Sequence, residues 1–232
     1  VALALTRNAS SVVFIGHSMG AISATDAAVR AAESGRRTAL VLIAPAIVAS
    51  RRLGPPSVKR RSVIARAVGA LTKLVVTRWP FRIFVRRLVL AKDFWPRGLG
   101  ATYGERARQD TDNVNEYAKR YARAAGVVGW ERGLLAFCAA RLEQVLNALL
   151  TGDSIEARLS NALASSSTPL DRVLVVNGID DQLVPVANAR RLVENLRTSA
   201  PAASVELVEI EGAGHCPHEE GDVSEIVGNF IK

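Results

Sequence analysis

A serine lies between two glycines in the segment Gly16–Gly20, whose sequence is GHSMG. The segment follows the apolar run Val12–Ile15 and precedes a stretch rich in small residues, which is typical of a sharp turn from a strand into a helix. At such a turn Ser18 projects its hydroxyl clear of a sheet, and the flanking glycines carry no side chain that would obstruct it. The backbone N–H of Met19, at the helix start, can stabilise an oxyanion. The pattern therefore predicts a nucleophile elbow.

A serine is a poor nucleophile at neutral pH unless a base activates it, and the chain has three histidines. His215 lies in a glycine-rich segment after the last expected strand, from which a mobile imidazole can reach Ser18. We predict that His215 is the base. His17 precedes the serine, and we expect it to point away from the hydroxyl and to pack or form a local hydrogen bond. We interpret His218 as a residue of a helix start or of the rim.

The carboxylate that orients this base should follow a strand, because open α/β sheets build their sites at the carboxyl ends of the strands. Asp180 and Asp181 both follow the apolar run Val173–Val176. Either aspartate gives the chain order serine, aspartate, histidine. The local sequence leaves both as candidates.

Four short apolar runs predict the strands that position these residues. Three are continuous and rich in β-branched residues, as in strands that are buried on both faces of a parallel sheet. The fourth has polar residues at alternating positions, which suits an edge strand. Helical patterns separate the runs, so we predict an α/β fold with about four parallel strands flanked by helices. The runs are 12–15, 40–43, 173–176 and 205–210.

The positive charge is concentrated in one segment of the chain. The whole chain has 30 Lys and Arg against 22 Asp and Glu, a formal net charge of +8. Residues 51–108 hold 15 of these basic residues and only two acids, so the remainder is net negative. Only helical patterns occur from 51 to 168. We therefore predict a sheet-containing core at 1–50 and 169–232 and an inserted all-helical lid at 51–168.

Three segments together resemble the α/β-hydrolase family: the elbow, the segment GIDDQLVP at 178–185 and the segment GHCPHEE at 214–220. The resemblance implies that the acid is the aspartate four residues before the proline, which is Asp181, and that Asp180 is a turn residue. The segment VVGWERGL at 127–134 resembles the return from lid to core in plant and algal members, many of them targeted to plastids. A serine nucleophile argues against the epoxide hydrolases and haloalkane dehalogenases of the family, which use aspartate.

The chain departs from the family upstream of the elbow. Family members carry further strands there and a His-Gly-type loop that provides a second oxyanion donor, whereas only 11 residues precede Val12. The chain also begins at Val1 without Met or a signal-peptide pattern. We interpret it as an N-terminally truncated fragment. We expect residues 1–232 alone to be inactive or nearly so and poorly soluble.

We predict a serine hydrolase that cleaves an acyl ester or a related acyl bond through an acyl-enzyme intermediate. Ser18 is the expected nucleophile, His215 the base and then the acid, Asp181 the orienting carboxylate, and the Met19 N–H an oxyanion donor. The expected substrate is a small molecule with a hydrophobic acyl group. Two alternatives stay open: a carbon–carbon bond hydrolase that uses the same triad, and a non-catalytic binding module with this fold.

Composition and cysteine content exclude several classes of protein. Hydrophobic residues make up 49% of the chain and charged residues 22%, which is typical of a globular protein and not of a disordered one. Cys138 and Cys216 lie in unrelated contexts, so we expect reduced thiols and a reducing compartment, with a plastid suggested by the resemblance. The sequence shows no metal-ligand spacing, and we expect no metal and no cofactor.

The basic lid has three interpretations: a solvated face, a surface for anionic membrane lipids, or a field that steers acidic substrates. The solvated face is the default interpretation. Lid aromatics interleave with arginines, as in an interfacial helix, but aromatics that pack over a pocket give the same pattern, and we favour the pocket. We expect no nucleic-acid partner, because no recognised binding motif accompanies the charge. The longest largely apolar run, 38–50, has 13 residues and includes a proline. We therefore expect no membrane-spanning helix.

Overall fold

The computed structural model describes residues 11–47, 63–76 and 78–232. These residues form two compact units, and each is described by itself. The sheet unit comprises the described residues 11–47, 102–107 and 155–232. The helical unit comprises 63–76, 78–101 and 108–154.

The sheet has four parallel strands in the order β1-β2-β3-β4, which confirms the predicted α/β fold. The carboxyl ends of the strands lie side by side: His17 pairs with Ile43, and Gly178 pairs with Ile210. The loops that follow the strands therefore meet at one edge of the sheet, where the candidate residues lie. The strands are β1 (Ser11–His17), β2 (Arg37–Ile43), β3 (Leu170–Gly178) and β4 (Ser204–Ile210).

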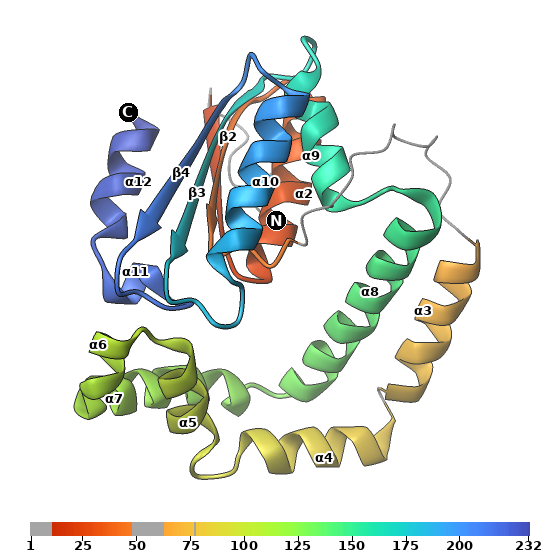
Figure 1. The fold of residues 1–232 in the computed structure, drawn as a ribbon. Coiled ribbons are helices and arrows are strands. Elements are labelled where there is room, and N and C mark those ends of the chain that lie inside the picture. The colour runs from red at the N-terminus through yellow and green to blue at the C-terminus, as the bar shows by residue number, and fades with distance from the viewer. Residues whose placement is uncertain (1–10, 48–62, 77) are drawn as a thin grey trace. The chain divides into compact units, whose positions relative to one another are not determined.

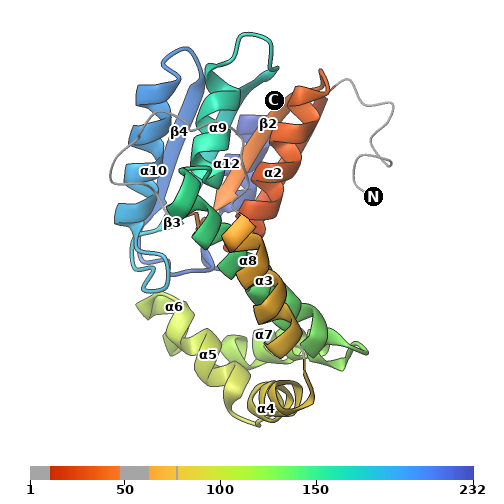
Figure 2. The same cartoon turned by 90° about the vertical axis from the view of Figure 1, so that its right-hand side faces the viewer.

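Helices cover both faces of this sheet (Figures 1 and 2). Helices α2, α9 and α10 bury one face, where the small residues of α2 allow the helix to pack closely on β1 and β2. Helix α12 covers part of the other face and contributes Val223 and Phe230 to a second apolar cluster. The helices are α2 (Gly20–Glu33), α9 (Ile155–Ala164), α10 (Val186–Ser199), α11 (Pro217–Glu220) and α12 (Val223–Ile231).

The described chain between β2 and α9 is helical. Helix α3 packs along α8, and α4 is joined to α8 by the buried Glu131, which accepts a 2.8 Å hydrogen bond from Arg82 and lies 3.5 Å from Arg86. The elements are α3 (Val63–Val76), α4 (Trp79–Val89), α5 (Phe94–Thr102), α6 (Glu105–Gln109), α7 (Thr111–Ala122), the 3-10 helix η1 (Arg123–Gly126) and α8 (Trp130–Thr151).

The division into units differs from the boundaries expected for the lid. Helix α9 belongs to the sheet unit, because it packs on α2 and α10, and the carboxylate of Glu156 accepts a hydrogen bond from Asn195 at 2.7 Å. Residues 102–107 also belong to the sheet unit, because Tyr103 donates a 2.6 Å hydrogen bond to Glu219. The sequences of α9 and of residues 102–107 resemble those of the neighbouring lid helices. Only the packing shows that both segments belong to the sheet unit.

Helix α8 differs from the expectation that no helix could span a membrane. Among the described residues it is the one helix that is long and apolar enough to do so, judged by length and composition, and only 6% of its apolar stretch is buried. Arg141 and Glu143 interrupt the apolar sequence of the helix, so this segment contains no long uninterrupted apolar run. Core helices of soluble proteins also meet this criterion, so it assigns no location to α8.

Candidate active site

Ser18 occupies a strained turn between β1 and α2. Its φ of 52° lies in the left-handed region, which residues other than glycine adopt rarely and at a cost of about 1 to 3 kcal/mol. Its N–H donates to the carbonyl of Ile43 at 2.9 Å, and its carbonyl accepts from Ala21 and Ala46, each at 3.1 Å. These three backbone bonds hold the conformation that directs the hydroxyl away from the sheet.

The two glycines of the elbow differ in what they make possible. A Cβ atom on Gly16 would lie 2.6 Å from the Cα atom of Ala21, so only glycine lets α2 begin this close to β1. A Cβ atom on Gly20 would have no described atom within 4 Å. The expectation that both glycines avoid obstruction is therefore correct for Gly16 and wrong for Gly20 within the described part of the chain.

His215 lies between the serine and an aspartate. Its Nε2 atom is 2.8 Å from Ser18 Oγ, and its Nδ1 atom is 2.8 Å from Asp181 Oδ2. Because a carboxylate only accepts hydrogen bonds, the proton of a neutral imidazole is placed on Nδ1. Nε2 then accepts from the serine hydroxyl. The structure thus brings Ser18, His215 and Asp181 into one hydrogen-bonded chain.

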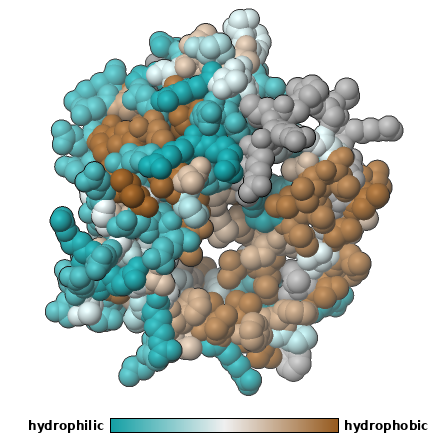
Figure 3. All heavy atoms as spheres, in the orientation of Figure 1, coloured by the Kyte–Doolittle hydropathy of each residue, from teal (hydrophilic) through white to brown (hydrophobic). Residues whose placement is uncertain are grey.

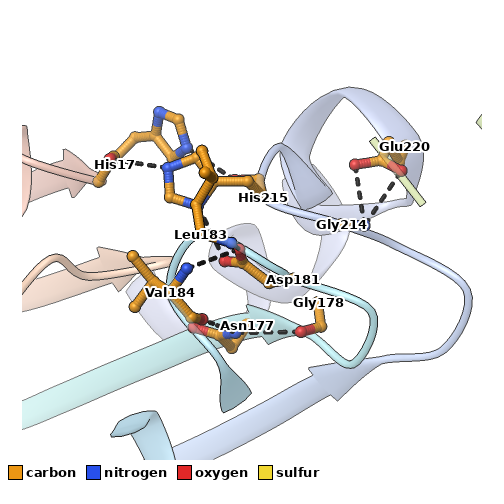
Figure 4. Close-up of polar contacts among 10 residues, drawn as sticks. His17, Asn177, Gly178, Asp181, Leu183, Val184, Gly214, His215 and Glu220 are labelled. Carbon is orange, nitrogen blue, oxygen red and sulfur yellow. Dashed lines mark hydrogen bonds and ion pairs between the residues drawn. The ribbon is translucent and has the colours of Figure 1, made fainter. Parts of the chain in front are cut away.

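Asp181 is buried and held by the loop that contains it (Figure 4). Its Oδ1 atom accepts hydrogen bonds from the backbone N–H groups of Leu183 at 2.9 Å and Val184 at 2.8 Å, which leaves Oδ2 directed at His215. Asp180 is exposed, and its N–H donates to the carbonyl of Ala213. Of the two aspartates, Asp181 is therefore the one that meets the histidine.

A carboxylate that the sequence reasoning missed fixes the loop before His215. Glu220 accepts a hydrogen bond from the N–H group of Gly214 at 3.0 Å (Figure 4). It also accepts from the N–H group of Gly104 at 2.7 Å, and the His215 N–H donates to the carbonyl of Thr102 at 2.7 Å. Glu220 is the second glutamate of GHCPHEE, so the sequence shows a carboxylate close to His215. Its partner at 104 was not predictable, because 116 residues separate the two.

His17 contacts His215 from the other side. Its Nε2 atom donates to the backbone carbonyl of His215 at 2.9 Å, and its ring centre lies 5.1 Å from that of His215 and 4.5 Å from that of His218. Burial lowers the pKa of His17 below its ordinary value of 6.5, an effect partly opposed by the hydrogen bond to His215. His17 is therefore a neutral donor that holds the backbone of His215 in place.

Met19 stands at the N-terminus of α2, with a φ of −63° and a ψ of −26°. Its N–H belongs to the first turn, where the helix dipole favours negative charge, so it suits an oxyanion. The prediction that the second oxyanion donor is absent concerns the residues upstream of β1. Those before Ser11 lie outside the described residues. The described residues contain no group of three or more His, Cys, Asp or Glu that could hold a metal ion.

Known proteins resemble this chain in sequence and in fold. The family described as "Alpha/beta hydrolase family" matches residues 1–227. The 2-hydroxy-6-oxo-6-phenylhexa-2,4-dienoate hydrolase of Rhodococcus sp. strain RHA1 is 16% identical with a TM-score of 0.56, over 99% of this chain and 68% of that chain. A thermophilic esterase of Thermogutta terrifontis is 16% identical with a TM-score of 0.55, over 99% and 68%.

The enol-lactonase of Burkholderia xenovorans LB400 is likewise 16% identical, with a TM-score of 0.55, over 99% of this chain and 70% of that chain. At this identity the likeness to solved structures shows the fold alone. A comparison with curated proteins found no match.

Proposed function

We propose that this chain, which belongs to the alpha/beta hydrolase family, is a serine hydrolase that cleaves acyl esters or related acyl bonds. The observation that carries the proposal is the hydrogen-bonded chain from Ser18 through His215 to Asp181, with 2.8 Å at each step. A nucleophile, a base and an orienting carboxylate in this order are the parts that acyl transfer through a serine requires.

In the proposed reaction Ser18 Oγ attacks the carbonyl carbon of the ester while its proton passes to His215 Nε2. The Met19 N–H stabilises the oxyanion of the tetrahedral intermediate. When the intermediate collapses, the imidazolium returns its proton to the leaving alkoxide, which departs as an alcohol. Asp181 stabilises the imidazolium and holds the tautomer in which Nε2 accepts. Ser18 then carries the acyl group.

Water completes the cycle. His215 Nε2 removes a proton from a water molecule, whose oxygen attacks the acyl carbon and forms a second tetrahedral intermediate. Its collapse breaks the bond to Ser18 Oγ, which regains its proton from His215. The products are a carboxylic acid and the unmodified enzyme.

The substrate we propose has a hydrophobic acyl group. Three large apolar side chains adjoin the triad in the sequence and are exposed: Met19 next to the nucleophile, and Ile179 and Leu183 on the two sides of the acid. Apolar surface in these positions favours an uncharged ligand over a strongly charged one. The chain length of the acyl group is best determined with a series of p-nitrophenyl esters.

A carbon–carbon bond hydrolase that uses the same three residues is the second candidate, since a dienoate hydrolase is among the structures with this fold. A comparison of kcat/KM for p-nitrophenyl esters and for a 2-hydroxy-6-oxo-dienoate separates the two. We expect higher values for the esters. Higher values for the dienoate would transfer the proposal to the second candidate.

A fluorophosphonate probe tests whether the chain is an enzyme at all. In the protein expressed from its complete gene, we expect covalent labelling that Ser18→Ala abolishes. Ser23→Ala is the matched control, because Ser23 is an exposed serine of α2 outside the triad, and this variant should label like the wild type. Failure of the wild type to label would favour the non-catalytic binding module.

A further inference from the structure

We propose that the helical unit binds the surface of an anionic lipid membrane through α3, α4 and α8. Three features of these helices carry the proposal. They are an apolar stripe on α4, large apolar side chains that face away from the α3–α8 contact, and an excess of positively charged residues near these apolar surfaces. The proposal does not depend on the chemistry proposed for the triad.

Helix α4 has the pattern of a helix that lies in a membrane interface. Phe81, Phe84 and Leu88 follow one another at spacings of three and four residues, so they share one face of the helix, and all three are exposed. Arg82 and Arg86, four residues apart, lie on another face and bind the buried Glu131. The helix is thus anchored by its arginine face, and its apolar face is turned outward.

Helices α3 and α8 contact each other through small residues. A shallow groove of about 600 Å³ between them is lined largely by glycine and alanine, and a Cβ atom on Gly69 would lie 2.6 Å from the Glu143 carboxylate. Ala139 of α8 is only 2% exposed. In many soluble helix pairs, large apolar residues fill the contact and hold the helices further apart than the small residues between α3 and α8 do.

The large apolar side chains of this pair point outward instead. Figure 3 shows hydrophobic residues gathered over α3 and α8. Each of the following is more than half exposed: Val63, Ile64, Leu71, Leu74, Leu149 and Leu150. Exposed apolar patches of this kind mark surfaces that bind a partner or a membrane.

Charge selects an anionic bilayer as the occupant. Within the helical unit, residues 63–101 contain eight Lys and Arg against one acid, Asp93. Arg87 lies between Phe84 and Leu88 in the sequence and is exposed, as are Arg78 just before the helix and Lys92 shortly after it. Basic residues near an apolar stripe add to the affinity for anionic lipid while the apolar side chains enter the acyl boundary.

Vesicle co-sedimentation tests the proposal. Binding to vesicles that contain about one third phosphatidylserine should exceed binding to pure phosphatidylcholine vesicles by at least about tenfold. Raising the salt from about 0.1 M to about 0.5 M should release the protein, because the ions screen the attraction between lipid and arginine. Binding that ignores lipid charge, or that persists at high salt, would overturn the proposal of a surface contact.

Two variants locate the contact. Phe84→Ser should weaken binding by at least about tenfold, because it removes the apolar surface that a phenylalanine buries in the bilayer. Arg87→Gln should weaken it by about fivefold. Their matched controls are Ile231→Ser and Arg191→Gln, which change an exposed isoleucine and an exposed arginine of the sheet unit. Circular dichroism spectra equal to that of the wild type establish that the variants are folded.

Two further outcomes contradict the proposal. If the controls weaken binding as much as Phe84→Ser and Arg87→Gln, the helical unit is not the contact. If the protein ignores vesicles but self-associates, and Phe84→Ser abolishes the association in analytical ultracentrifugation, the occupant of this surface is a second copy of the chain. Hydrolysis of a soluble ester should be unchanged in Phe84→Ser, because Phe84 takes no part in the triad.

Discussion

Two neighbouring aspartates offer the sharpest distinction at the residue scale. Asp181→Asn places an amide opposite His215 Nδ1, and the amide N–H donates where the carboxylate accepted. The imidazole then takes the other tautomer, whose Nε2–H cannot accept the serine proton. We expect kcat to fall by about 10⁴. Asp180→Asn, at the exposed neighbour, should change kcat far less in the same ester assay, and the reverse ranking would make Asp180 the acid.

His17 gives a prediction about pH. Burial lowers its pKa in the folded protein, so between its unfolded and folded pKa values the unfolded chain binds more protons than the folded one. Stability is therefore lost as the pH falls below about 6.5 and towards the lower, folded pKa. His17→Gln keeps a side-chain N–H donor but removes the titration.

The free energy of unfolding, measured in urea at about pH 7.5 and about pH 5, should consequently fall less in His17→Gln than in the wild type. The difference between the two proteins isolates His17, because the other ionisable groups are shared. An equal loss of stability in both would show that His17 does not titrate as its burial implies.

At the element scale, the close approach of α2 to β1 depends on one glycine. Gly16→Ala would place a methyl group 2.6 Å from a backbone atom of α2, and rigid backbone cannot yield cheaply. We expect a loss of stability of several kcal/mol, or no folded protein, in urea titrations. Gly20→Ala is the matched control and should be neutral or stabilising by about 0.5 to 1 kcal/mol. Equal effects of the two would contradict the described packing.

Sequence and structure agree best where the pattern is local. The apolar runs lie inside the four observed strands, and the helix expected directly after the elbow corresponds to α2. The elbow and its neighbours were predictable because turn, serine and small residues are adjacent in the chain. The ends of elements differ by a few residues, since hydrogen bonds extend strands such as β3 beyond their apolar centres.

The parts of the site that could not be predicted depend on contacts between distant segments. Nothing near Gly104 indicates that its N–H meets Glu220, and nothing in α9 indicates that it packs on the sheet unit. The choice of Asp181 over Asp180 came from a family resemblance, because both aspartates follow the strand directly. Spacing alone does not show which carboxylate a turn directs at the histidine.

At the scale of the whole molecule, β1 is an edge strand of the described sheet. Ile15 near its end is 53% exposed, and apolar edge strands are templates for aggregation. Ile15→Lys should reduce aggregation of the 232-residue chain in light scattering, because charge on an edge strand disfavours pairing. Val128→Lys adds the same charge at an exposed valine outside the sheet and should help less. Equal effects would assign the aggregation to net charge or to another surface.

The most direct test of the central claim is to trap the acyl-enzyme. After rapid mixing of the protein expressed from its complete gene with a p-nitrophenyl ester and an acid quench, mass spectrometry of the peptides should find the acyl group on Ser18. Ser18→Ala should show neither the adduct nor the burst of nitrophenol. An acyl group found instead on Cys216, the thiol next to the base, or turnover without an adduct at Ser18, would contradict the account.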